Sequence, residues 1–130
     1  MTEFIKPTDA ELEILHILWE NGAQSVRFVN EKLGEQSRDI GYTTTLKTMQ
    51  VMFDKRLLTR DDSARSHIYA AALPQQDMQQ RLLDRFVASA FRGSAQQLVM
   101  QALGNRHATA DEIAEIKALI EQLEGNADRD

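Results

Sequence analysis

The chain has 130 residues, of which 42% are hydrophobic and 27% charged, and its formal net charge is −5. This composition is typical of a folded protein with one domain, or with one small domain and an oligomerising extension. The sequence has no cysteine, no apolar run of about 18 residues and no basic start followed by an apolar segment. We therefore expect no disulfide, thiolate metal site, membrane span or secretory signal, and a cytoplasmic location.

The first helix is predicted by a capping box, because Thr8 is a good N-cap and Glu11 follows it three residues later. The helix should cover residues 9–20 and end at Gly22, which tolerates a positive φ. His16 has no second His or Cys nearby at ligand spacing, so we expect a structural role for it. The residues expected to form the core side are Leu12, Ile14, Leu15, Ile17, Leu18 and Trp19.

A second helix is predicted over residues 26–33, with Ser25 as its N-cap and Gly34 as its end. Its inward side should carry Val26, Val29 and Leu33, with Phe28 beside them. The polar segment that follows is typical of a loop.

The third helix, over about residues 42–56, has two unlike faces. An apolar stripe of Leu46, Met49 and Phe53 recurs at steps of three and four, which predicts the buried side. A second stripe offers hydroxyls, one ammonium and methyl groups, which can contact base edges, phosphates and thymine methyls. This stripe consists of Thr44, Lys47, Thr48 and Val51. Two interpretations follow: a DNA-recognition helix, or an ordinary amphipathic helix with a solvated threonine-rich face.

After the third helix the pattern changes to period two. The segments LLTRDD and SHIYAA predict two short strands around a turn at residues 61–65. Three helices followed by a hairpin describe a winged helix-turn-helix, in which the third helix enters the major groove. On this interpretation Arg60, Arg65 and Ser66, with His67 close by, meet phosphates; the alternative for Arg65 is a solvated turn residue.

The charged residues are unevenly distributed, so the acidic net charge does not describe every part of the chain. Residues 38–69 carry six basic and four acidic side chains, whereas residues 74–130 carry six basic and nine acidic ones. A mildly basic middle and an acidic tail suit a DNA-binding protein whose other end has a different task.

Pro74 marks a predicted boundary between a winged-helix domain at residues 1–73 and a helical dimerisation domain at residues 74–130. The second part predicts three amphipathic helices, which cannot easily close a core of their own. We expect their apolar seams to pack against a second copy as a twofold homodimer; the alternative is a monomer whose tail folds back. The predicted dimerisation residues are Leu82, Phe86, Phe91, Leu98, Val99, Leu103, Ile113, Ile116, Ile120 and Leu123.

Three segments carry a resemblance: LEILHILWENG at residues 12–22, YTTTLKTM at 42–49 and SAQQLVMQAL at 94–103. Together they resemble the BlaI/MecI/CopY family, the penicillinase-type repressors of bacteria. The resemblance implies a mainly α, homodimeric winged-helix repressor that binds a palindromic double-stranded DNA operator with TACA/TGTA-type half-sites. Its implied recognition residues are Thr43, Thr44, Lys47 and Thr48, and the hairpin around Arg65 matches the wing.

The sequence departs from that family pattern in the recognition helix, at the cleavage position and in its lack of cysteine. Val51 stands where many members have a basic residue, and Arg56 stands where they have glycine. Gln101 and Ala102 replace the Asn-Phe bond at which β-lactam-responsive members are cleaved, and the cysteine cluster of copper-responsive members is absent. The mode of release therefore stays open between a small molecule, an upstream protease and a partner such as an antirepressor.

The sequence also bears on two other classes of function, an enzyme and a protein-interaction module. The sequence has no cysteine nucleophile, no glycine-rich phosphate loop and no H-E-x-x-H motif, so we expect neither an enzyme nor a cofactor or metal site. The runner-up is a winged-helix protein-interaction module that does not read DNA, which the net charge of −5 and Val51 favour.

Overall fold

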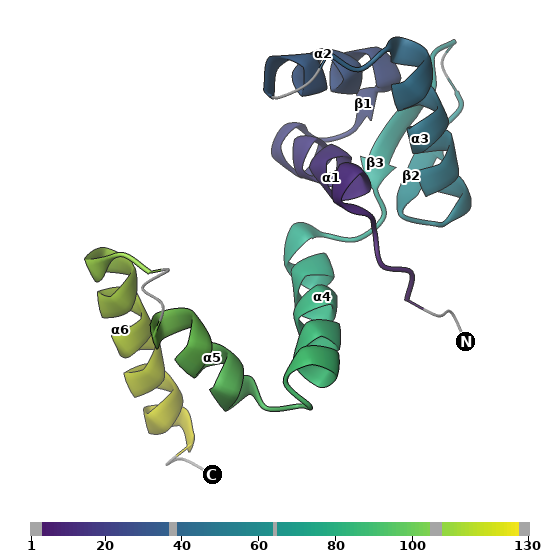
Figure 1. Cartoon of the computed structure of the whole chain (residues 1–130). Helices are drawn as coiled ribbons and strands as arrows, with labels where there is room; N and C mark the ends of the chain where they lie inside the picture. The colour runs from purple at the N-terminus through teal and green to yellow at the C-terminus, as the bar shows by residue number, and fades with distance from the viewer. Residues whose placement is uncertain (1–3, 37–38, 64, 105–107, 128–130) are drawn as a thin grey trace. The chain divides into compact units, whose positions relative to one another are not determined.

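The computed structural model describes residues 4–36, 39–63, 65–104 and 108–127. The chain divides into two compact units, Met1–Leu82 and Leu83–Asp130. Within the described residues the elements, labelled in Figure 1, are α1 (Asp9–Asn21), β1 (Gln24–Ser25), α2 (Val26–Gln36), α3 (Tyr42–Asp54), β2 (Leu58–Asp61), β3 (Ile68–Ala71), α4 (Gln75–Ala90), α5 (Ala95–Gly104) and α6 (Ala110–Ala127).

The predicted caps of the first two helices are confirmed. The Thr8 hydroxyl accepts from the Glu11 N–H at 3.1 Å, and the Glu11 carboxylate accepts from the Thr8 N–H at 2.9 Å. Ser25 Oγ accepts from the Phe28 N–H, and Gly22 ends α1 at a φ of 76°. The predicted end of α2 at Gly34 is wrong, because the helix continues to Gln36. An interior glycine costs a helix only about 1 kcal/mol, which this turn tolerates.

A three-stranded antiparallel sheet joins the helices of the first unit. The predicted hairpin is confirmed as β2 and β3, paired from Leu58 opposite Ala71 to Asp61 opposite Ile68. β3 is the central strand, since the short β1 pairs with its other edge. β1 was not predicted, because two residues are too short to display an alternating pattern.

The core of the first unit lies between α1, α2, α3 and the sheet. Its largest fully buried side chains include Tyr69, Leu15, Ile17, Met49 and Met52. The predicted inward stripe of α3 is only partly correct: Met49 is buried, but Leu46 and Phe53 are half-buried.

The centre of the buried side of α3 falls on Thr45, Met49 and Met52. Thr45 is a buried polar residue that apolar periodicity does not reveal. The Asn30 amide donates to the Thr45 hydroxyl at 2.9 Å and to the Ile40 carbonyl at 2.7 Å. Burial of the hydroxyl is therefore compensated, and the same amide fixes the chain where it enters α3.

These elements confirm the predicted fold class: three helices and a β-hairpin form a winged helix-turn-helix. Figure 1 shows α1, α2 and α3 gathered against the sheet. Within the described residues, no helix is both long and apolar enough to cross a membrane.

The start of α4 belongs to the first unit. Met78 is buried in its core, Leu82 packs against that core, and the Trp19 indole N–H donates to the Leu73 carbonyl at 2.9 Å. The boundary between the two compact units therefore lies within α4, after Leu82. The predicted domain boundary lies at the beginning of the same helix.

The second unit contains the rest of α4 together with α5 and α6. Side chains cap the beginnings of α5 and α6: Ser94 Oγ accepts from the Gln97 N–H, and Thr109 and Glu112 form a second capping box. None of the side chains described between residues 83 and 126 is fully buried. Among its described residues, this unit has helices but no closed core.

α3 ends in a Schellman motif that places Arg56 in the left-handed region, with a φ of 67°. The Arg56 N–H donates to the Phe53 carbonyl at 3.0 Å, and the Leu57 N–H donates to the Met52 carbonyl at 2.9 Å. The expectation that Arg56 occupies a position suited to glycine is confirmed.

Replacing Arg56 by glycine should therefore stabilise the protein by about 0.5–1 kcal/mol, because glycine adopts this conformation without steric cost. Arg56→Ala is the matched control, since it removes the same charge and keeps the strained φ. Urea denaturation measures both variants. Equal stability of the glycine and alanine variants would contradict the expectation.

Candidate nucleic-acid interface

The outward face of α3 carries most of the predicted recognition residues. Thr43, Thr44 and Lys47 are exposed, and Thr48 is half-buried. The Thr48 hydroxyl donates its hydrogen to the Thr44 carbonyl at 2.9 Å, and its oxygen stays able to accept a hydrogen bond from a base. Thr43, Thr44 and Lys47 keep their polar groups on the outside, over the first two turns of the helix.

Two residues of α3 beside the candidate interface were not predicted. Gln50 and Tyr42 are exposed on the side of α3 that faces the wing. Gln50 lies three residues after Lys47 and seven after Thr43, so the helical period could have placed it on the same face. A glutamine amide can pair with two atoms of an adenine in the major groove.

A groove brings α3 and the wing together. Arg65, Ser66 and His67 from the hairpin line it opposite Tyr42 and Gln50 of α3. Arg27 at the start of α2 also lines this groove and is exposed. Arg27 was missed because a lone arginine on a helix has no distinguishing pattern in the sequence.

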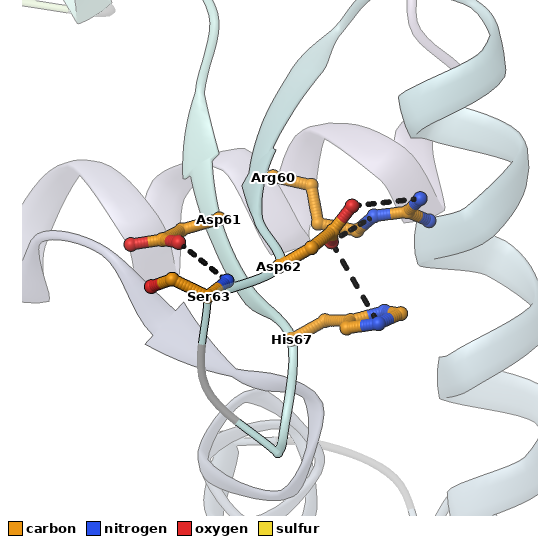
Figure 2. A network of polar contacts seen from close by, with 5 residues as sticks. All are labelled: Arg60, Asp61, Asp62, Ser63 and His67. Atoms are coloured by element: carbon orange, nitrogen blue, oxygen red, sulfur yellow. Dashed lines mark hydrogen bonds and ion pairs between the residues drawn. The ribbon is translucent and has the colours of Figure 1, made fainter.

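Arg60 is engaged within the hairpin, and Figure 2 shows its guanidinium beside the Asp62 carboxylate. Its guanidinium donates to the Asp62 carboxylate at 2.7 and 3.4 Å and lies 4.1 Å from the centre of the Phe53 ring. The hydrogen bond to Asp62 raises the pKa of Arg60 further. Binding of a phosphate by Arg60 would have to compete with Asp62, so the role predicted for this residue stays untested.

The two acidic residues at the wing tip, Asp61 and Asp62, make further contacts within the hairpin. Asp62 lies 3.7 Å from His67 Nε2, and the Asp61 carboxylate accepts from the Ser63 N–H at 2.9 Å, as Figure 2 shows. Hydrogen bonding from Ser63 lowers the pKa of Asp61. The tip therefore uses its two carboxylates within the hairpin, while Arg65 lies exposed in the groove beside α3.

An ion pair between Glu11 and Lys55 fixes the far end of α3. Lys55 Nζ lies 2.8 Å from Glu11 Oε2, and the Glu11 residue is only 4% exposed. Burial opposes ionisation of Glu11, but hydrogen bonds from Lys55 and the Thr8 N–H, with the charge of Lys55, outweigh it and lower the pKa. The first turn of α1 and the end of α3 are thus joined through one carboxylate.

No cluster of metal ligands is found in the part of the chain that the structure describes. No three side chains among His, Asp and Glu gather there in a way that could hold a metal ion. His16 is exposed, and its ring makes an edge contact with Trp19 at 5.1 Å between centroids.

The fold and this polar helix face define a winged-helix protein of the kind that binds DNA. The family model described as penicillinase repressor matches residues 7–122, and the chain belongs to this family of DNA-binding transcriptional repressors. The resemblance to the penicillinase-type repressors is thereby confirmed.

The chain also resembles a solved winged-helix structure at low sequence identity. A solved structure of a cysteine-to-serine mutant of MarR from E. coli, complexed with operator DNA, is similar with a TM-score of 0.49 and 14% identity. The match covers 90% of this chain and 75% of that one. No match was found among curated proteins.

The Glu11–Lys55 pair predicts a pH-dependent stability. Because the pKa of Glu11 is lower in the folded state, the unfolded state binds more protons in acid, and stability falls as the pH drops below about 4.3. We expect Glu11→Gln to lower the unfolding free energy by about 1–3 kcal/mol at pH 7, and the difference from the parent to shrink as the pH approaches about 3.

Glu13→Gln is the matched control, since Glu13 lies on the same helix and is exposed. It should change stability by less than about 0.5 kcal/mol. Urea denaturation at a series of pH values makes the measurement. A Glu11→Gln deficit that stays constant from pH 7 to pH 3 would show that ionisation of Glu11 does not matter.

Proposed function

We propose that the protein is a homodimeric repressor that binds a palindromic operator through α3 and the wing. The observation that carries this proposal is the groove in which Gln50 of α3 and Arg65 of the hairpin lie opposite one another, beside the exposed Lys47. A helix of this kind places its first turns in the major groove, while basic side chains beside it meet the phosphates.

The side chains of α3 indicate which turns of the helix should contact DNA. Thr43, Thr44, Lys47 and Gln50 offer hydrogen-bonding groups for base edges or phosphates. The last turn ends in the exposed Asp54, which would repel phosphates, so the contacts should concentrate on the first three turns.

We expect residues beside α3 to contact the phosphates. Arg65 and Ser66 at the wing and Arg27 at the start of α2 line one groove with it. Phosphate contacts supply much of the affinity for DNA, so a protein with a net charge of −5 depends on such local cations and should bind strongly only at moderate salt.

A second copy is the proposed partner of the C-terminal helices. Many of their apolar side chains have no cover within one chain: Leu83 is 44% exposed, Phe86 51%, Leu119 53% and Leu123 56%. Exposure of this extent on one small unit is characteristic of an interaction surface. A twofold dimer would bury these side chains and place two α3 helices on two half-sites.

The ten predicted dimerisation residues fit that role to different degrees. Five are exposed, namely Phe86, Val99, Ile113, Ile120 and Leu123, and five are half-buried, namely Leu82, Phe91, Leu98, Leu103 and Ile116. Leu82 packs against the core of the first unit, so it is the least suited to contact a second copy.

We propose an upstream protease or an antirepressor as the partner that releases the protein from the operator, with a small molecule as the alternative. Gln101 and Ala102 are exposed on α5, so they are accessible in the single chain, although they do not form the Asn-Phe bond of the cleaved members.

Reversing the charge at Lys47 tests the DNA-binding role. Lys47→Glu should weaken binding to the DNA upstream of the protein's own gene by at least about tenfold, because it removes a contact and places a carboxylate against the DNA. A mobility-shift titration at moderate salt measures the effect.

The control is Lys32→Glu, which makes the same change of net charge on α2, outside the groove that α3 shares with the wing. It should weaken binding far less. If the parent protein showed no preference for any upstream sequence, the repressor would be abandoned in favour of a protein-interaction module. If both variants bound like the parent, α3 would not be the reading element.

The proposed dimer is tested at α6. Ile120 is 46% exposed and lies on the apolar seam, so Ile120→Glu should shift the protein toward monomer. Gln122→Glu adds the same charge on the opposite side of the helix and should leave the dimer intact. Sedimentation velocity measures the mass of each; a monomeric parent, or an unaffected Ile120→Glu variant, would refute the proposed interface.

A further inference from the structure

A small recess lies between the outward face of α3 and the first turn of α1. It is distinct from the groove beside the wing and lies along the other edge of α3. Its lining residues are Thr8, Ala10 and Glu11 from the start of α1 and Thr44, Lys47, Thr48 and Val51 from α3. Val51 is 44% exposed, which is a large fraction for an apolar residue on a helix that packs against the core.

The polar groups around this recess are mostly engaged elsewhere. The Thr48 hydroxyl donates its hydrogen to the Thr44 carbonyl and keeps only acceptor capacity, so an apolar ligand would meet the Thr48 methyl group. Both Glu11 oxygens are also taken, one by the Thr8 N–H and the other by Lys55 Nζ. The methyl groups of Ala10 and Val51 add to this surface, so the recess is apolar although charged residues border it.

An apolar recess on a DNA-binding face restricts what it can accept. Apart from Thr44 and Lys47, which also line the recess, phosphates and the polar edges of bases would find few hydrogen-bond partners there to replace water. The 5-methyl group of thymine is the one apolar group that the bases present in the major groove. Lys47 at the border offers a cation to an acceptor on a neighbouring base or to a phosphate.

We propose that this recess is a thymine-methyl subsite, with Val51 as the residue that determines specificity for it. The inference rests on the proposed function, since it requires α3 to enter the major groove. Each half-site should then contain one position at which thymine is preferred for its methyl group alone. The same subsite should accept 5-methylcytosine in preference to cytosine, since the two methyl groups occupy equivalent places in the groove.

Replacing thymine by uracil in the operator tests the inference at the level of one methyl group. Each thymine of one half-site is replaced in turn, and the dissociation constant is measured by fluorescence anisotropy at fixed salt. One replacement should weaken binding by about fourfold, the equivalent of one apolar carbon returned to water. The others should have smaller effects.

The decisive comparison repeats the scan with Val51→Ala. Because Val51 is exposed, the variant should fold normally, which thermal denaturation verifies. The penalty at the sensitive thymine should fall below about twofold, since the alanine no longer contacts the methyl group. Gln50→Ala is the matched control, since Gln50 lies on the opposite edge of α3; there the penalty should persist.

The outcomes separate the two levels of the argument. If the parent protein binds no operator selectively, the proposed function fails and the subsite fails with it. If it binds the operator selectively but no uracil replacement weakens binding, only the thymine-methyl subsite is overturned. The same holds if the sensitive position keeps its full penalty in Val51→Ala, because the methyl group is then bound by another residue.

Discussion

In the first unit, polar contacts hold both ends of α3 in place, while the outer face of this helix stays exposed. Asn30 anchors its beginning by donating to the Ile40 carbonyl and the Thr45 hydroxyl, and the Glu11–Lys55 pair anchors its end at 2.8 Å. Between these anchors, buried methionines fill the core. A recognition surface needs such support, since a side chain misplaced by about 1 Å loses its hydrogen bond.

The distribution of polar contacts explains how an acidic protein can present a DNA-binding face. Three carboxylates outside α3 are engaged internally: Glu11 by Lys55, Asp62 by Arg60 and Asp61 by the Ser63 N–H. Their charges are thereby partly compensated, and Lys47 and Arg65 remain on the outside beside α3. The net charge of the whole chain is therefore a poor guide to the field at this face.

Sequence reasoning predicted the parts of the fold that depend on local chemistry. Capping residues such as Thr8 gave the beginnings of helices, and the change to period two gave the hairpin. It failed where tertiary partners decide. Nothing local indicates that Thr45 is buried, since this requires Asn30 from another helix, or that Arg60 turns toward Phe53 and Asp62. Gln50 was missed because the predicted stripe was placed toward one edge of the exposed face.

The central claim is that two copies of α3 read two half-sites of one operator. Hydroxyl-radical footprinting of the upstream DNA tests it directly. The account predicts two protected patches related by twofold symmetry, with centres about one helical turn or a multiple of it apart. A single patch without a symmetric counterpart, or protection that is the same on unrelated DNA, would contradict it.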